Sequence, residues 1–307
     1  MKIIEPYLVD KPYPLIGAKT IQLIVMREIL DYTVLRTEED RQLNTVYTPL
    51  SVKEDKPTRR VAFLATKQKA AESRQLEQLL RTAAEEGGLS IPECYLKDKL
   101  CMKCPRCGLY GATSTESGQS DRANIKHRIE YSTAFSLLPY ENIATVTTFN
   151  AINDRNITTG QALGSRYAVA PATLFPSIVT LKSVTWIELV LAVKTLLACK
   201  SYGAESRIGG DVRNTIIGVI AGWEEVITSL ELTLELYDRR NNNTPANIAE
   251  FIKKDYVPKA GNPDRVIVLE EEQTDELIKG LVNTALDKGL LEEAYKDIKD
   301  YRSMQIG

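Results

Sequence analysis

The sequence predicts an α+β fold built on antiparallel sheet. Strand-like and helix-like segments occur in mixed order along the 307 residues, which is typical of this class. The segments 143–152 and 157–171 flank the turn-forming "NDRN", as expected of the two arms of a long ribbon. A loop-rich stretch at 91–127 interrupts the pattern, and no glycine-rich phosphate loop follows a predicted strand. These features argue against a doubly wound nucleotide-binding fold.

The first half of the chain contains strand patterns and one strong helix. Residues 19–36 alternate apolar and polar side chains and predict one long or bent strand, and "RVAFLAT" at 60–66 predicts a second. The segment 67–87 consists of helix formers and ends at Gly87, so it predicts a helix with a glycine stop. Strand-like alternation returns over 128–139.

The second half predicts a regular succession of strands and helices. Residues 175–181 predict a short strand, 185–201 predict a helix capped by Thr185, and 215–222 predict a buried strand. The remaining predicted elements are a helix at 224–240, whose β-branched residues also allow a strand, a helix at 247–257, a strand at 265–271 and two helical segments within 274–301.

Composition indicates a soluble globular protein, with 43% hydrophobic and 26% charged residues. The longest apolar stretches are too short and too charged to span a bilayer, and the N-terminus lacks the pattern of a secretory signal. We therefore expect a cytoplasmic protein without a membrane partner. Reducing conditions there favour metal ligands or catalytic groups over disulfides as the role of clustered cysteines.

The charge is nearly balanced overall but uneven along the chain. A formal net charge of −2 excludes binding of nucleic acid by bulk positive charge alone. Residues 97–128 contain seven Lys or Arg against three Asp or Glu, whereas 238–307 contain eleven against fourteen. This distribution permits a local groove for an anionic ligand but does not require one, and on charge alone ordinary solvated surface is the favoured explanation.

Four of the five cysteines lie within fourteen residues, in the pattern C-x6-C-x2-C-x2-C. The segment "CPRCG" has the form of a zinc knuckle, in which two thiolates three positions apart bind one metal and glycine permits the tight turn. The predicted ligands are Cys94, Cys101, Cys104 and Cys107, with His127 as the alternative fourth ligand. The favoured role is structural zinc that holds the 91–127 insertion together.

Other roles for these cysteines remain open at the sequence level. Three closely spaced cysteines plus one also suit an iron–sulfur cluster, and a redox pair or free thiols are further alternatives. Catalytic zinc is disfavoured, because it needs an open coordination position and a nearby base and the chain has one histidine.

From residue 128 onward the chain resembles the RAMP superfamily of CRISPR proteins. The resemblance is carried by "NAINDRNITTGQALGSRYAVAPATLFPSIVTL" at 150–181 and by a helix followed by "SYGAESRIGGDVRN" at 201–214. More narrowly, the chain is similar to the Cas-seven-type backbone subunit of the type I-D Cascade complex. The likeness includes the first strand and the position of the cysteine-bearing insertion.

This resemblance implies a ferredoxin-like, RRM-type palm with a zinc-stapled insertion and a β-ribbon thumb. The implied boundaries are 1–90 and 128–240 for the palm, 91–127 for the insertion, 143–170 for the thumb and 241–307 for a C-terminal α/β segment. The implied function is a subunit that polymerises along CRISPR RNA and presents it for pairing with target DNA in antiviral defence. Its implied partners are CRISPR RNA, single-stranded target, further copies of itself and other Cascade subunits.

The resemblance also implies that certain residues contact RNA. Arg207 and Arg213 bracket Gly209 and Gly210, so that guanidinium groups can bind phosphate where glycine permits a close approach. Without the resemblance, such a loop is simply a connection.

The predicted thumb and first strand supply the remaining candidates. In the thumb these are Phe149 and Tyr167 for stacking and Arg155 and Arg166 for phosphate. In the first strand, Arg27 is either an RNA contact on the sheet face or paired with Glu28 or Asp31.

Two enzymatic alternatives accompany the RNA-binding hypothesis. In the first, the chain is a nuclease that cuts the target strand within the same assembly, with Asp154 as a weak catalytic candidate. An aspartate in a turn ordinarily caps the local backbone, which favours a structural role for it. In the second, the chain is a zinc-stapled metabolic enzyme, which the lack of a cofactor cradle and of histidines disfavours.

Overall fold

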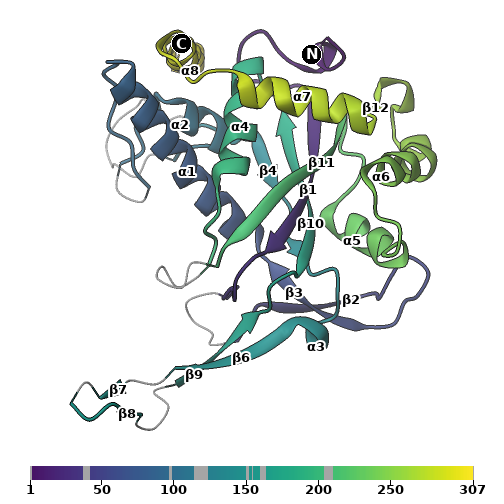
Figure 1. Ribbon diagram of the computed structural model, residues 1–307. Coiled ribbons are helices and arrows are strands. Elements are labelled where there is room, and N and C mark those ends of the chain that lie inside the picture. The colour runs from purple at the N-terminus through teal and green to yellow at the C-terminus, as the bar shows by residue number, and fades with distance from the viewer. Residues whose placement is uncertain are drawn as a thin grey trace.

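A five-stranded antiparallel sheet forms the centre of the computed structural model (Figure 1). The structure describes residues 2–36, 42–96, 99–113, 124–149, 152–153, 155–159, 164–203 and 210–306. In spatial order the strands are β12 (Ile267–Val268), β11 (Val212–Gly222), β1 (Thr20–Ile29), β10 (Leu174–Lys182) and β4 (Ile129–Tyr131). This confirms the prediction of a mixed fold with antiparallel sheet.

Two long helices cover one face of this sheet. They are α1 (Ala65–Glu86), which comes after β3 in the chain, and α4 (Trp186–Ala198), which comes after β10. When the elements that lie between them are left out, β1, α1, β4, β10, α4 and β11 follow one another as β-α-β-β-α-β, a succession also found in ferredoxin-like folds. Leu23 and Val25 of β1 pack on this face in one buried cluster with both helices.

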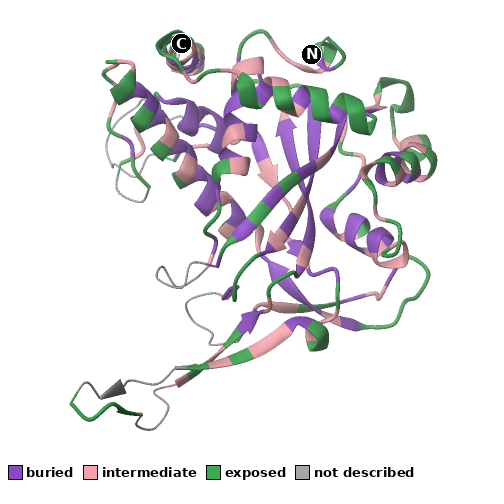
Figure 2. Ribbon diagram, in the orientation of Figure 1, coloured by how far each residue is buried: buried purple, intermediate pink, exposed green. Residues whose placement is uncertain are grey.

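The opposite face of the sheet is covered as well. Ile24 belongs to a second buried cluster together with residues of α5 (Ser229–Asp238) and α6 (Pro245–Phe251). Figure 2 shows the central strands as mostly buried. RRM modules read RNA with aromatic side chains on the sheet itself, and that surface is occupied by the protein's own helices here.

A second layer of short strands lies below the central sheet. It contains a three-stranded sheet of β2 (Thr45–Thr48), β3 (Thr58–Phe63) and β5 (Ala134–Phe135), and the helical turn α3 (Tyr140–Ile143). The prediction of a single strand over 128–139 is therefore wrong, because this segment contains β4 and β5, which belong to different sheets.

A two-stranded ribbon projects from this layer. It begins with β6 (Ala144–Phe149) paired with β9 (Gly164–Val169) and ends with β7 (Ile152–Asn153) paired with β8 (Thr158–Thr159). Both pairs are antiparallel, as the two predicted arms require, and the ribbon extends away from the body of the protein (Figure 1).

The helix boundaries follow from capping. Thr185 accepts from Glu188 N–H and Glu188 accepts from Thr185 N–H, a capping box that starts α4 where the sequence predicts it. Thr228 and Glu231 form the same motif, so α5 begins later than the predicted helix at 224–240.

Three further helices complete the chain. They are α2 (Pro105–Tyr110) in the cysteine-rich insertion, and α7 (Glu271–Asn283) and α8 (Lys288–Ile306) near the C-terminus. The short helical turns are η1 (Glu5–Tyr7), η2 (Ile252–Tyr256), η3 (Val257–Lys259) and η4 (Pro263–Arg265). Among the described residues, no helix has the length and apolar character needed to span a membrane.

Candidate metal site and nucleic-acid surface

The four clustered cysteines converge on one point. The sulfur atoms of Cys94, Cys101, Cys104 and Cys107 all lie within 4.8 Å of one another. A tetrahedral zinc site with Zn–S bonds of about 2.3 Å separates its sulfurs by about 3.8 Å. Cys94 Sγ lies 3.5 Å from Cys107 Sγ, so the arrangement fits a four-thiolate metal site with little adjustment.

Backbone amides support the sulfur atoms. Cys104 is the N-cap of α2, and its Sγ accepts a hydrogen bond from Cys107 N–H at 3.4 Å. Cys94 Sγ accepts from Cys101 N–H at 3.5 Å. Hydrogen bonds to thiolate oriented in this way are what a zinc knuckle provides, and here they arise from the short spacing of the cysteines.

The close approach of the four thiols disfavours the ionisation of all of them together. Hydrogen bonds from Cys101 and its neighbours lower the pKa of the Cys94 thiol, while contacts within the same group raise the pKa values of Cys104 and Cys107. Ionisation of one thiol therefore opposes ionisation of the others. A divalent metal ion removes this conflict, because it stabilises all four thiolates at once.

His127 lies apart from this group. Among the described residues, the potential metal-binding cluster consists of the four cysteines alone. The His127 imidazole lies 3.9 Å from Glu130, and burial together with Lys69 lowers its pKa. The geometry therefore favours Cys94 over His127 as the fourth ligand.

The insertion is fastened to the rest of the protein at two places. Arg106 of α2 is buried, and its Nε donates to Ser73 Oγ of α1 at 2.9 Å. A Cβ on Gly108 would lie 2.1 Å from Ile298 Cδ1, which shows how closely α8 packs on α2. The cysteine site therefore stabilises an element that lies between α1 and α8.

The structure contradicts the expectation that Arg27 contacts RNA on the sheet face. Its side chain is fully buried under α1, and Nη1 lies 2.8 Å from Glu72 Oε1. Burial is the largest single influence and lowers the pKa of Arg27, but Glu72, Tyr202 and Tyr131 together outweigh it, so the pKa is raised. The two predicted partners, Glu28 and Asp31, are not the residue that neutralises it.

The glycine loop is described only at its two ends. Arg207 and Gly209 lie outside the described residues. Arg213 is about half exposed and forms an ion pair with Glu28 directly across β1. Gly210 has φ +67, and a Cβ there would lie 2.7 Å from Thr33 Cγ2, so this position requires glycine for packing.

Several residues that were predicted to contact RNA lie on the ribbon. Arg155 is exposed near the tip, and Arg166 donates from Nε to Thr147 Oγ1 at 3.2 Å on the neighbouring strand. Tyr167 is 38% exposed opposite Val146, so its ring is available for stacking. The side chain of Phe149 and the whole of Asp154 lie outside the described residues.

The structure adds a row of cations that the sequence analysis missed. An open pocket of about 420 Å³ is lined by Arg36, Lys67 and Arg74, and no carboxylate is among the described residues that line it. A second pocket of about 290 Å³ is lined by Arg74, Arg81 and Tyr95 among others, and Glu77 is its acidic member. Arg74 is shared, so the two pockets are adjacent along α1.

The spacing of these cations follows from helix geometry. Lys67, Arg74 and Arg81 are seven residues apart, so they lie on one face of α1 at intervals of about 10 Å. We call these three residues the α1 cation row. It runs from the base of the glycine loop to the cysteine site. Its signal was present in the sequence as Lys and Arg at heptad spacing.

Comparison with known proteins places this fold among CRISPR proteins. A family profile described as "Csc2 Crispr" matches residues 8–293. The crystal structure of Thermofilum pendens Csc2 has a TM-score of 0.66 at 22% sequence identity, covering 100% of this chain and 95% of that one. No protein with a curated description matches the chain.

Subunits of larger assemblies show the same fold at lower similarity. A chain of a structure titled "CRISPR RNA-guided surveillance complex" matches with a TM-score of 0.51 at 12% identity, covering 85% of this chain and 99% of that one. A pre-nicking form of such a complex matches with the same TM-score at 11% identity. Because the family profile spans nearly the whole sequence, this chain belongs to the Csc2 family of CRISPR proteins.

Proposed function

We propose that the chain is the Cas-seven-type backbone subunit of a type I-D CRISPR complex and binds single-stranded guide RNA independently of its sequence. Membership of the Csc2 family and the likeness to subunits of RNA-guided complexes support this function. The guide held in this way is presented for pairing with a single-stranded target. Other Cascade subunits and further copies of the chain are the remaining proposed partners.

The α1 cation row is the observation that carries the proposal. It places positive side chains at regular intervals along one helix of an otherwise slightly acidic protein. Regular cations on a rigid element suit a phosphate backbone, because they position the strand without reading its bases. Tyr95 is 43% exposed at the end of the row and offers a ring for one base.

The ribbon and the glycine loop extend the proposed RNA surface. Arg155 and Arg166 lie on the ribbon, and Arg213 lies at the end of the glycine loop. We assign the ribbon the role of a thumb that contacts the guide beyond the body of the protein. Arg207 and Gly209 complete the proposed set within the glycine loop.

We assign zinc to the four-cysteine site, with a structural role. The donor set of four thiolates, three of them buried, suits zinc and leaves no coordination position for a substrate. The metal holds the 91–127 insertion against α1 and α8, next to the end of the cation row. In this way zinc supports the RNA surface without taking part in chemistry.

Absorbance of the purified protein tests the proposed RNA binding directly. Protein from a mild-salt preparation should show excess absorbance at 260 nm, and a high-salt wash should remove it, because phosphate contacts release counterions. The stripped protein should then bind oligouridine and a mixed-sequence RNA with similar affinity at low salt. Absence of nucleic acid in the preparation together with no binding at low salt contradicts the proposal.

A further inference from the structure

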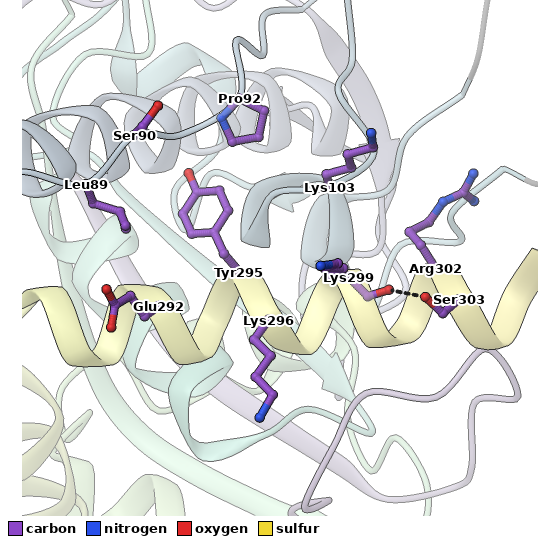
Figure 3. A pocket seen from close by; sticks show the side chains of 10 residues that line it. All are labelled: Leu89, Ser90, Pro92, Lys103, Glu292, Tyr295, Lys296, Lys299, Arg302 and Ser303. Carbon is purple, nitrogen blue, oxygen red and sulfur yellow. Dashed lines mark hydrogen bonds between the residues drawn. The ribbon is translucent and has the colours of Figure 1, made fainter.

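A large groove lies beside α8, between this helix and the segment that follows α1. It has a volume of about 800 Å³, and Leu89, Pro92 and Tyr295 form its apolar floor. Figure 3 shows the Tyr295 ring rising from α8 toward Pro92. On its other side this ring packs against the cysteine cluster, so the floor is held in place by the metal site.

The rim of the groove is strongly basic. Lys103, Lys296, Lys299 and Arg302 line it, and Glu292 is the one carboxylate among the described residues of its lining. Three of these cations follow one another at three-residue spacing on α8. Arg302 also binds Gln305 within the same helix, which holds its side chain along the groove. An occupant of this groove has to present several negative charges on a short, regular element.

The chain itself contains a short element with several negative charges, next to the β12 edge of the central sheet. The first turns of α7 expose Glu271, Glu272, Asp275 and Glu276, with Lys279 one turn later. This acidic turn follows β12, the edge strand of the central sheet. In Figure 1 the β12 end of α7 points away from α8, and a helix of this length spans about 20 Å. One chain therefore cannot place its own acidic turn in its own groove.

The edge at β12 also exposes an apolar ring. Trp223 is 43% exposed directly after β11, and the Arg265 guanidinium lies 4.8 Å from its ring centroid. The four exposed carboxylates of α7 are opposite in charge to the four cations that line the groove.

We propose that the α8 groove of one copy receives the acidic start of α7 from a second copy. Because donor and acceptor surfaces lie on different edges, the contact is head-to-tail and can continue from copy to copy. This inference rests on the proposed function as a backbone subunit, and it specifies which two surfaces meet. RNA along the α1 cation row is then an additional link between neighbouring copies.

Charge reversal on each surface tests the contact. The groove variant is Lys299→Glu with Arg302→Glu, and the α7 variant is Glu272→Lys with Asp275→Lys. The full-length protein, stripped of nucleic acid, is studied by sedimentation velocity at low salt over a concentration series. Wild type should self-associate, and each variant alone should associate at least about tenfold more weakly, because like charges then face each other.

Mixing the two variants gives the decisive result. Every contact between the unlike variants pairs opposite charges again, so the equimolar mixture should recover wild-type association. The variant Lys53→Glu with Lys56→Glu, which changes two exposed lysines on another loop, should behave as wild type. Unchanged melting temperatures verify that each variant is folded.

Three outcomes overturn the proposal: stripped wild type that stays monomeric, variants that associate normally, or a mixture that fails to recover. Fluorescence anisotropy with oligouridine is measured in parallel on dilute, monomeric protein. Loss of RNA affinity in the groove variant alone assigns the groove to nucleic acid and also overturns it. If wild type does not bind RNA at all, the proposed function fails while the mixing result still decides this contact.

Discussion

Arg27 is surrounded by partners that come from distant parts of the chain. Its guanidinium contacts Glu72 on α1, Ser177 on β10 and Asn214 on β11, and Tyr202 Oη lies 3.1 Å from Nη1. Glu72 is 45 positions away in sequence. Local pattern reasoning considers neighbours such as Glu28, so the true partner of Arg27 could not be predicted from the sequence.

Removing one member of this buried ion pair should be costly. Arg27→Met leaves the Glu72 carboxylate unpaired in the interior, and we expect a loss of about 3–5 kcal/mol in the free energy of unfolding. The double variant Arg27→Met with Glu72→Met should recover much of this loss. Urea unfolding measures both values. Normal stability of Arg27→Met together with weaker RNA binding contradicts a structural role.

Arg213 was predicted from the sequence as a phosphate contact, but its ion pair with Glu28 was not predicted. Its ion pair with Glu28 is partly exposed and competes with any phosphate contact. Glu28→Gln should therefore increase RNA affinity by about twofold to fivefold, since surface pairs of this kind are worth at most about 1 kcal/mol.

Arg213→Ala should weaken RNA binding by a similar factor across all sequences. Fluorescence anisotropy with two unrelated RNA sequences measures both variants. We expect RNA affinity to increase in Glu28→Gln and to decrease in Arg213→Ala. An effect limited to one RNA sequence would instead indicate base recognition.

At the scale of elements, the sequence was most informative where local chemistry decides the structure. The helix formers of α1 and the N-cap residue Thr185 predicted two core helices to within a few residues of their observed bounds. The spacing of the cysteines likewise predicts the group of four sulfur atoms that the structure brings together and that could hold a metal ion. These features depend on neighbours along the chain.

Other elements depend on packing that the sequence does not display. The segment 128–139 alternates like one strand, yet its two halves pair with β10 and β3 in different sheets. The sequence contains the seven-residue spacing of the α1 cation row. Only the structure shows that these cations line two adjacent pockets that share Arg74. Contacts between distant segments decided both cases.

The metal site should control the insertion and leave the sheet intact. Cys104→Ser with Cys107→Ser removes two of four ligands, so we expect loss of one zinc per chain by elemental analysis. Amide exchange should increase in α2 and in the part of α8 that packs on it, while β1 and β10 keep their protection. Cys199→Ala, a buried cysteine outside the cluster, is the matched control and should retain zinc.

Two results contradict this account of the insertion. Iron instead of zinc in the purified protein, or full metal content in the double serine variant, shows that the four-thiolate zinc site is wrong. Global loss of exchange protection in the sheet shows that the insertion is required for the whole fold.

For the whole molecule, the charge distribution supports the proposal that a slightly acidic protein binds an anionic strand. Cations are gathered along α1 and around the α8 groove, whereas carboxylates are gathered at the start of α7. Both faces of the central sheet are covered, so the strand is expected to follow the helix and ribbon surfaces. The central claim is that the α1 cation row holds RNA through its phosphates.

The salt dependence of RNA affinity tests this claim most directly. The triple variant Lys67→Gln, Arg74→Gln and Arg81→Gln is compared with wild type by anisotropy over a series of potassium chloride concentrations. Each lost phosphate contact reduces the slope of log affinity against log salt by about 0.7, so three contacts predict a reduction of about 2 for any RNA sequence. A control triple variant replaces the exposed Lys53, Lys56 and Lys254 and should keep the wild-type slope. A wild-type slope in the α1 variant, with the protein folded, contradicts the account.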